Sequence, residues 1–224
     1  MECYSQQDLT GNEKEIEICK GDFYMIYPVK KQLVVAFGEG DKNRLGVAST
    51  SNTGPKPAYI TKNMGAKRVF SSFSHSCIID KKDQLWRCGV IKRSSNEEAE
   101  YVPINIKEKV RLVALGKFSI FVVTDDNKIY RQGFSKEGAL GINSDYSNMT
   151  KMDKVDDEEQ ITDKIIDITS GTHFTLFVTE TGKLYGCGNR FLKEISLDGD
   201  NKIIQIPLKE GTKVLKAYAS MGHS

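Results

Sequence analysis

The sequence predicts an all-β protein, a β-propeller built from four-stranded blades of which about four are present. The first observation is that a glycine closes an apolar strand four times, in steps of 51, 44 and 55 residues. These glycines are Gly38, Gly89, Gly133 and Gly188. The second observation is that a series of small residues advances by the same steps and adds a further one of 51. This series is Gly21, Ser72, Gly116, Gly171 and Gly222.

Three strands recur in each repeat, in a fixed order. The first ends at the small residue and is expected at 15–21, 67–72, 110–116, 165–171 and 216–222. The second is β-branched and aromatic and is expected at 23–29, 76–80, 119–124 and 174–179. The third ends at the closing glycine and is expected at 32–38, 83–89, 127–133 and 182–188. Turns rich in Asp, Asn and Gly separate the second and third strands, which predicts a β-hairpin in every repeat.

No segment shows the helical periodicity of ten or more residues that a helix would need. A small sheet with two apolar faces cannot bury them alone, so neighbouring repeats must stack. Four-stranded units that stack radially form the blades of a propeller.

The stretch GEGDKNRLG (38–46) recurs as GFSKEGALG (133–141). The positions that carry the match are Gly38, Leu45 and Gly46 in the first copy and Gly133, Gly138, Leu140 and Gly141 in the second, with Asn43 in the place of Gly138. A phosphate-binding loop would continue into Lys-Ser/Thr and a helix, and neither copy does so. The turn is therefore interpreted as a repeated connection, with glycine where the backbone needs positive φ or close packing.

These patterns resemble the regulator-of-chromosome-condensation repeat. SFSHS (72–76) carries its His-Ser pair at His75, and Trp86 and Gly89 lie in its Trp-Gly strand. The two nine-residue turns are similar to its closing motif. In the stretches that begin at Gly89 and Gly188, only the first glycine of this motif is kept. The resemblance extends from about residue 13 to the end.

The resemblance implies a seven-bladed ring, so these residues are expected to form part of one. The expected organisation is an N-terminal arm at 1–12 and a partial propeller at 13–224. Its repeats lie near 13–66, 67–109, 110–164 and 165–213, with the start of a fifth at 214–224. Because seven such units need roughly 350 residues, the ring is expected to be completed by a longer chain or by a second chain.

Composition limits the class of function. The net charge of +2 lacks the basic excess of a nucleic-acid-binding domain, and no apolar run is long enough for a membrane helix. The five cysteines are scattered and never spaced C-x-x-C, and no N-terminal targeting signal is visible. An intracellular protein is predicted, cytoplasmic (including cytoskeletal or ciliary) or nuclear, with proteins as partners rather than membranes or nucleic acid.

No catalytic, metal or cofactor site is predicted. The histidines His75, His173 and His223 lie in or beside one repeat position, which indicates a structural role. Cys88 and Cys187 occupy equivalent places before the closing glycine and are expected to be buried. Two charged loops, 92–101 and 155–160, are either solvated connections or interaction sites. Their candidate residues are Lys92, Arg93, Glu97, Glu98, Asp156, Asp157, Glu158 and Glu159.

The resemblance implies three functions. The first is a non-catalytic protein–protein interaction scaffold in a larger complex, which needs only a rigid ring with variable loops. The second is a guanine-nucleotide exchange factor for a Ran-type small GTPase, although no clear wedge insertion is visible. The third is chromatin docking, which a basic N-terminal tail would support and this N-terminus does not. The single Trp86 excludes the tryptophan cluster of the related plant ultraviolet-B photoreceptor.

Overall fold

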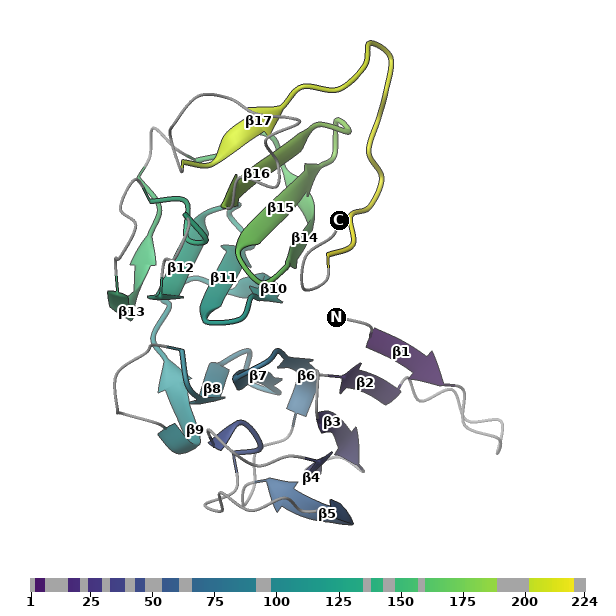
Figure 1. Ribbon diagram of the computed structural model, residues 1–224, viewed down its shortest axis with the longest axis vertical. Helices are drawn as coiled ribbons and strands as arrows, with labels where there is room; N and C mark the ends of the chain where they lie inside the picture. Colours follow the sequence, from purple (N-terminus) through teal and green to yellow (C-terminus); the bar gives the residue numbers. More distant parts are fainter. Residues whose placement is uncertain are drawn as a thin grey trace. The chain divides into compact units, whose positions relative to one another are not determined.

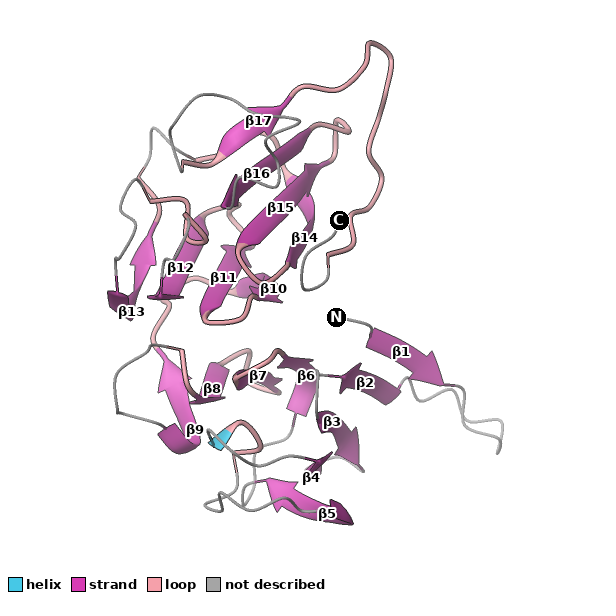
Figure 2. Cartoon of the chain, viewed as in Figure 1, coloured by secondary structure: helices cyan, strands magenta, loops and turns pink. Residues whose placement is uncertain are grey.

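The computed structural model describes residues 3–6, 16–20, 24–29, 33–38, 43–46, 54–60, 66–91, 98–134, 138–142, 148–156, 160–188 and 202–219. The chain divides into two compact units, Met1–Val90 with Ser94–Ile106 and Ile91–Arg93 with Lys107–Ser224. Each unit contains two antiparallel sheets whose strands follow one another in chain order (Figure 1). The described residues are strands and loops, apart from one short helical turn at Asn43 (Figure 2).

Unit 1 holds a five-stranded and a four-stranded sheet. The first comprises β1 (Cys3–Gln6), β2 (Ile16–Lys20), β3 (Tyr24–Val29), β4 (Leu33–Gly38) and β5 (Gly54–Ile60). The second comprises β6 (Ala66–Ser71), β7 (His75–Asp80), β8 (Leu85–Gly89) and β9 (Glu98–Ile104). Strands β2 and β3 pack against β6, so the two sheets are stacked.

Unit 2 holds two four-stranded sheets. The first comprises β10 (Val110–Leu115), β11 (Ser119–Thr124), β12 (Ile129–Phe134) and β13 (Asn148–Lys154). The second comprises β14 (Ile165–Ser170), β15 (Phe174–Thr179), β16 (Leu184–Gly188) and β17 (Ile204–Ile206). Strand β10 packs against β14. The prediction of an all-β fold with four-stranded blades is confirmed.

The second strand of a blade is the most deeply buried. All six residues of β7, of β11 and of β15 are buried. A strand covered on both faces needs a continuous apolar or small-residue run rather than alternation, as SIFVVT in β11 and FTLFVT in β15 provide. The outer strand β9 carries Pro103, and the outer strand β13 carries Lys151 and Lys154, which suits a sheet edge.

The first strand of three blades carries a bulge at the same repeat position. The register shifts between Ala66 and Arg68 in β6, and the same shift recurs five residues before Gly116 in β10 and before Gly171 in β14. The extra residues are Lys67, Arg111 and Ile166. A bulge re-aims the side chain of its extra residue, and in β10 this residue, Arg111, donates from Nη2 to the Asn127 side chain.

The hairpin turns also repeat. In each of the three turns that the structure describes, one residue has positive φ, namely Asp83 (63°), Asn127 (65°) and Gly182 (86°). Each donates its N–H to the carbonyl three residues earlier, at 3.1, 3.0 and 2.9 Å respectively. A tight turn followed by a left-handed residue is a frequent hairpin connection, and Asn, Asp and Gly tolerate that conformation best.

The closing glycine leaves no room for a side chain. Gly89, Gly133 and Gly188 have φ values of 86°, 128° and 108°, and a Cβ on any of them would collide with a backbone carbonyl on the neighbouring strand connection. The carbonyls belong to Ser74, Phe118 and His173 respectively. Glycine recurs here because both the backbone conformation and the close approach require it.

Two segments differ from what the sequence predicts for them. Residues 216–219 do not form the expected strand, although Ala217 N–H donates to the Asp167 carboxylate at 3.2 Å and Ala219 is buried. A strand needs a continuous backbone ladder with a neighbour, and the bond from Ala217 goes to a side chain. Residues 3–6, inside the expected N-terminal arm, form β1 and pair with β2.

Candidate interaction surface

The described part of the first nine-residue turn is a loop (43–46, the first closing loop) that inserts into the second sheet of unit 1. Leu45 has no exposed surface and belongs to a core cluster with Val69 of β6, Ile78 of β7 and Cys88 of β8. The N–H of Gly46 donates to the carbonyl of Asn43 at 3.0 Å, and Asn43 has a φ of 54°. The loop therefore joins two blades through a buried leucine.

Arg44 is the largest fully buried side chain near this loop, with 1% exposure. Its Nη1 donates to the carbonyl of Phe73 at 2.7 Å, and its guanidinium lies 5.8 Å from the centre of the Phe73 ring. Its own carbonyl accepts a 2.7 Å bond from Ser76 Oγ. A buried guanidinium is tolerated only when such bonds replace water, so Arg44 is a structural residue here.

The second closing loop (138–141) repeats this arrangement in unit 2. Leu140 is fully buried in a core cluster that includes Cys187 and Ile203. The N–H of Gly141 donates to the carbonyl of Gly138 at 2.7 Å, and Gly138 has a φ of 75°. Because Asn43 and Gly138 share their backbone conformation and their hydrogen bond, the looser match between the two turns has a geometric basis.

A buried arginine also holds the second closing loop, but it comes from a strand. Arg131 Nη1 of β12 donates to the carbonyls of Leu140 and Gly141 at 3.1 and 3.0 Å. Its side chain is 5% exposed. The two closing loops thus use the same leucine and different arginines, and the glycines around them serve the architecture of the blades.

The other repeat-motif residues have internal partners. His75 begins β7 and is fully buried, with Nδ1 at 3.0 Å from Ser72 Oγ and 3.3 Å from Ser74 Oγ. Trp86 of β8 is half-buried and donates from Nε1 to Asp80 Oδ2 at 3.0 Å. The Ser72 N–H donates to the His75 carbonyl at 3.0 Å. At the equivalent positions, the N–H groups of Gly116 and Gly171 donate to the carbonyls three residues further on at 2.9 Å each. Gly38 ends β4 with a φ of 120°, and Gly222 lies outside the described residues.

Cys88 and Cys187 are both buried free thiols, packed against Leu45 and Leu140 respectively. Burial raises the pKa of the Cys88 thiol to about 12. A thiol that stays protonated at neutral pH is neither a nucleophile nor a ready metal ligand. These positions act as small apolar contacts for the closing loops.

Of the charged loops singled out in the sequence, the structure describes little. Asp156 is exposed. It follows Val155, which is fully buried, and precedes Gln160, which is half-buried. Gln160 accepts a 2.9 Å bond from the Ile129 N–H at its Oε1, which anchors this end of the loop. Glu98 begins β9. The candidate residues Lys92, Arg93, Glu97, Asp157, Glu158 and Glu159 lie outside the described residues.

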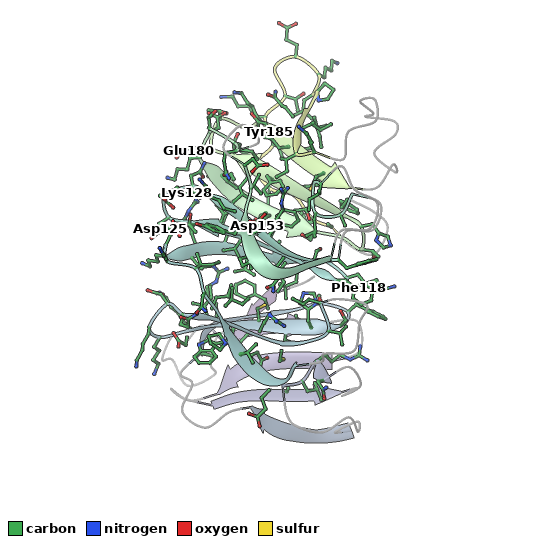
Figure 3. All side chains as sticks on the ribbon, turned by 90° about the vertical axis from the view of Figure 1, so that its left-hand side faces the viewer. Phe118, Asp125, Lys128, Asp153, Glu180 and Tyr185 are labelled. Atoms are coloured by element: carbon green, nitrogen blue, oxygen red, sulfur yellow. The ribbon has the colours of Figure 1, made fainter. Side chains whose placement is uncertain are left out.

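The hairpin turns and strand starts of unit 2 gather charged side chains on one side, which we call the turn face. Figure 3 shows Asp125, Lys128 and Glu180 on this side and Phe118 on the opposite one. The turn face consists of Glu108, Lys109, Asp125, Asp126, Lys128, Asp163, Lys164, Glu180 and Lys183. It contains five carboxylates and four ammonium groups, so its charge is almost balanced.

Ion pairs on the turn face repeat from one blade to the next. Lys109 pairs with Asp125 at 3.8 Å, and Lys164 pairs with Glu180 at 3.7 Å, in equivalent positions. All four side chains are more than half exposed. Exposed pairs contribute little to stability, so these charges are available for contacts with another molecule.

Tyr130, Glu108 and Lys128 form a coupled group at the edge of the turn face. Tyr130 donates its hydroxyl to Glu108 Oε2 at 2.9 Å, which lowers the pKa of the carboxyl. Burial and this bond raise the pKa of Tyr130 to about 12. The Asp126 carboxylate, 2.7 Å from Lys128 Nζ, raises the pKa of the lysine. The group therefore keeps its charges over a wide pH range.

Asn127 is a joining residue that sequence analysis did not single out. Its Nδ2 donates to the carbonyls of Ile161 and Asp163 at 3.0 Å each, and its Oδ1 accepts from the Ile165 N–H and from Arg111 Nη2 at 2.8 and 3.1 Å. The amide thus ties the turn of one blade to the start of the next. Its place in the sequence Asp-Asp-Asn predicts a hairpin turn but does not indicate the contacts with the next blade.

Among the described residues, no group of three or more His, Cys, Asp and Glu side chains could hold a metal ion. Within the same part of the chain, no helix is long and apolar enough to cross a membrane.

The chain matches known proteins along its length. The family described as regulator of chromosome condensation (RCC1) repeat matches residues 165–189, which cover β14, β15 and β16. The regulator of chromosome condensation of Homo sapiens is 25% identical over 208 residues, 85% of this chain and 48% of that protein. The guanine nucleotide exchange factor SRM1 of Saccharomyces cerevisiae is 28% identical over 124 residues, 54% of this chain and 25% of that protein.

Solved structures agree on the fold. Human WBSCR16 superposes with a TM-score of 0.78 at 14% identity, covering 97% of this chain and 58% of that one. Yeast RCC1 (Prp20), solved bound to Kap60, has a TM-score of 0.74 at 16% identity, covering 90% and 51%. The chain spans about half the length of the human relative and of the yeast structure. With its repeated blades and closing loops, the chain is similar to proteins of the RCC1 repeat family and shares the blade architecture of their β-propellers.

Proposed function

We propose that this chain is a non-catalytic protein–protein interaction scaffold that acts as a subunit of a larger complex. The observation that supports the proposal is the turn face of unit 2. Its charges sit on hairpins that the blade core and Asn127 hold in place, so a partner would meet them already arranged. Binding to a preorganised surface costs less conformational entropy than binding to one that must be ordered first.

The nearly balanced charge of the turn face favours a partner with a complementary pattern of both signs. Such patterns contribute more to specificity and to association rate than to raw affinity. The exposed pairs Lys109–Asp125 and Lys164–Glu180 could exchange their internal partners for groups on the bound protein. We therefore expect a complex that weakens as the salt concentration rises.

The test is co-purification of the full chain from its own cells, followed by measurement of the mass and stoichiometry of the complex. A double charge reversal, Asp125→Lys with Glu180→Lys, is compared with Asp153→Lys, which reverses an exposed carboxylate on β13. The proposal expects a fixed-stoichiometry partner that the double variant loses and the Asp153→Lys control retains. Equal retention by both variants would locate binding elsewhere, and the absence of any stoichiometric partner would contradict a scaffold role.

The second candidate is guanine-nucleotide exchange on a Ran-type small GTPase, because the yeast relative SRM1 carries that activity in its name. The matched region is only a quarter of that relative, so activity of the whole protein stays a proposal. Release of labelled GDP from a purified Ran-type GTPase separates the two candidates. Acceleration by catalytic amounts of this chain would favour exchange, whereas binding without acceleration would favour the scaffold.

A further inference from the structure

Strand β1 pairs with β2 in a register that places two cysteines opposite each other. Antiparallel pairing joins Cys3 to Cys19, and then Tyr4 to Ile18, Ser5 to Glu17 and Gln6 to Ile16. The cysteine pair is the last one of the ladder, at the end away from the connection 7–15. In the five-stranded sheet, β1 is the edge strand and β2 is its neighbour.

Directly opposed residues of antiparallel strands have Cα atoms about 4.5 or about 5.5 Å apart, depending on whether the pair is hydrogen-bonded. Disulfides join residues whose Cα atoms are about 4.4 to 6.8 Å apart. Both kinds of pair fall in this range, so the register alone brings Cys3 and Cys19 within bridging distance. We propose that Cys3 and Cys19 form a reversible disulfide under oxidising conditions, which locks β1 to the first sheet.

The remaining cysteines do not compete for this reaction. Cys77, Cys88 and Cys187 are buried free thiols. Cys77 and Cys88 lie on adjacent strands, but Cys88 is opposite Ser76 and Cys77 is opposite Arg87. Because side chains alternate along a strand, these two thiols point to opposite faces of the sheet. Burial also raises the pKa of both, which keeps them as unreactive thiols.

Glutathione disulfide supplies the oxidant in a balanced reaction. One cysteine thiolate attacks a sulfur of glutathione disulfide, forms a mixed disulfide and releases one glutathione thiolate. The second cysteine thiolate then attacks the protein sulfur of the mixed disulfide and releases the second glutathione. The protein loses two protons and two electrons, and glutathione disulfide is reduced to two molecules of glutathione.

The consequence of the bond would be a covalent closure of the segment from Cys3 to Cys19. In the reduced protein, β1 is held by a short ladder at the edge of its sheet. Edge strands with few paired neighbours open more easily than strands inside a sheet. Oxidation would suppress the separation of β1 from β2, and reduction would restore it. The attachment of the N-terminal strand would therefore depend on the redox state.

The experiment oxidises the reduced full chain with excess glutathione disulfide, blocks free thiols with iodoacetamide under denaturing conditions and digests with trypsin. Cleavage after Lys14 and Lys20 puts Cys3 and Cys19 in separate peptides, 1–14 and 15–20, each with a single cysteine. The proposal expects these two peptides to be linked to each other, with Cys77, Cys88 and Cys187 alkylated. Reduction before digestion should separate them.

Two variants serve as controls. Cys19→Ser should abolish the link, and the combined change Ile18→Cys with Cys19→Ser moves the thiol one residue out of register, onto the other face of β2. The off-register variant should give no link or far less of it than the natural protein. The proposal would be overturned by glutathione on both cysteines without a link, by links between two chains, or by equal linkage in the off-register variant.

Discussion

The carboxamide oxygen of Asn127 accepts a 2.8 Å hydrogen bond from the backbone N–H of Ile165, 38 residues further along the chain. The turn of one blade thereby holds the first residue of the next blade's first strand. Arg111, the bulged residue of β10, donates to the same oxygen at 3.1 Å. In the preceding blade the equivalent positions are Lys67 and Asp83, which form an ion pair at 2.6 Å. The same place in the repeat is thus a half-buried joint in unit 2 and a surface pair in unit 1.

Asn127→Gly should destabilise the protein by about 2–4 kcal/mol, because it removes several hydrogen bonds of about 1 kcal/mol each. Glycine keeps the positive φ of 65° without strain, so the loss reports the side chain alone. Asp83→Gly is the matched control, with a φ of 63° and a partly exposed ion pair. It should change the free energy of unfolding by less than about 1 kcal/mol. Urea unfolding compares them, and equal costs would contradict the joint.

The leucines of the two closing loops should be equally important for stability. Leu45→Ala and Leu140→Ala each remove a fully buried side chain from a core cluster and should cost about 2–5 kcal/mol. Leu215→Ala, at a position 81% exposed, is the control and should change stability by less than about 0.5 kcal/mol. Chemical unfolding of the three variants gives the answer. A cost near that of the control at either loop would show that the loop does not join its blades.

Gly133→Ala tests the close approach at the third strand's end. The added methyl group would meet the Phe118 carbonyl and would hold a φ of 128°, so the cost should exceed about 3 kcal/mol. Gly211→Ala also places a side chain at positive φ, here 80°, but nothing lies within 4 Å of the added atom. It should cost about 1–2 kcal/mol, the strain of the left-handed backbone alone. Thermal unfolding would contradict the interpretation if the two losses were similar.

Much of the fold could be predicted from the sequence because it rests on repetition. The second strands were placed almost to the residue, since 119–124 and 174–179 are continuous apolar runs that end at a turn. The closing glycines can be recognised in the sequence because any side chain at Gly89 or Gly133 would collide with a backbone carbonyl, so glycine recurs there. A steric constraint of this kind determines which residue type occupies the position, so the sequence reveals it.

The outer strands and the joints could not be predicted in the same way. Strand β13 reads NMTKMDK, which has neither alternation nor an apolar run, because its outer edge faces away from a neighbouring strand. Arg44 reads as a loop cation, and its burial depends on Phe73, 29 residues further on in the connection between β6 and β7. Asn127 and Asp83 occupy equivalent turns, and only the path of residues 161–165 makes one of them a joint. Such contacts follow from tertiary structure rather than local pattern.

The Tyr130–Glu108 hydrogen bond predicts how stability changes at high pH. The pKa of Tyr130 is raised to about 12 in the folded protein, above the ordinary value near 10. The folded state therefore binds this proton more tightly than the unfolded state does, and the associated stability is present below about pH 10. It should be lost as the pH rises from about 10 to about 12, and urea unfolding over this range measures the loss.

Tyr130→Phe should remove this part of the alkaline loss, while Tyr218→Phe, at a 69% exposed position, controls for removal of a tyrosine hydroxyl. The same variant has an opposite signature in acid. The Tyr130 hydroxyl is the main reason that the pKa of Glu108 is lowered, so its removal should raise the pKa of that carboxyl toward the ordinary value. In the natural protein the Glu108 contribution is present above the ordinary carboxyl pKa and fades as the pH falls through the lowered one. An NMR titration of Glu108 that is unchanged in Tyr130→Phe would show that the hydrogen bond does not control either group.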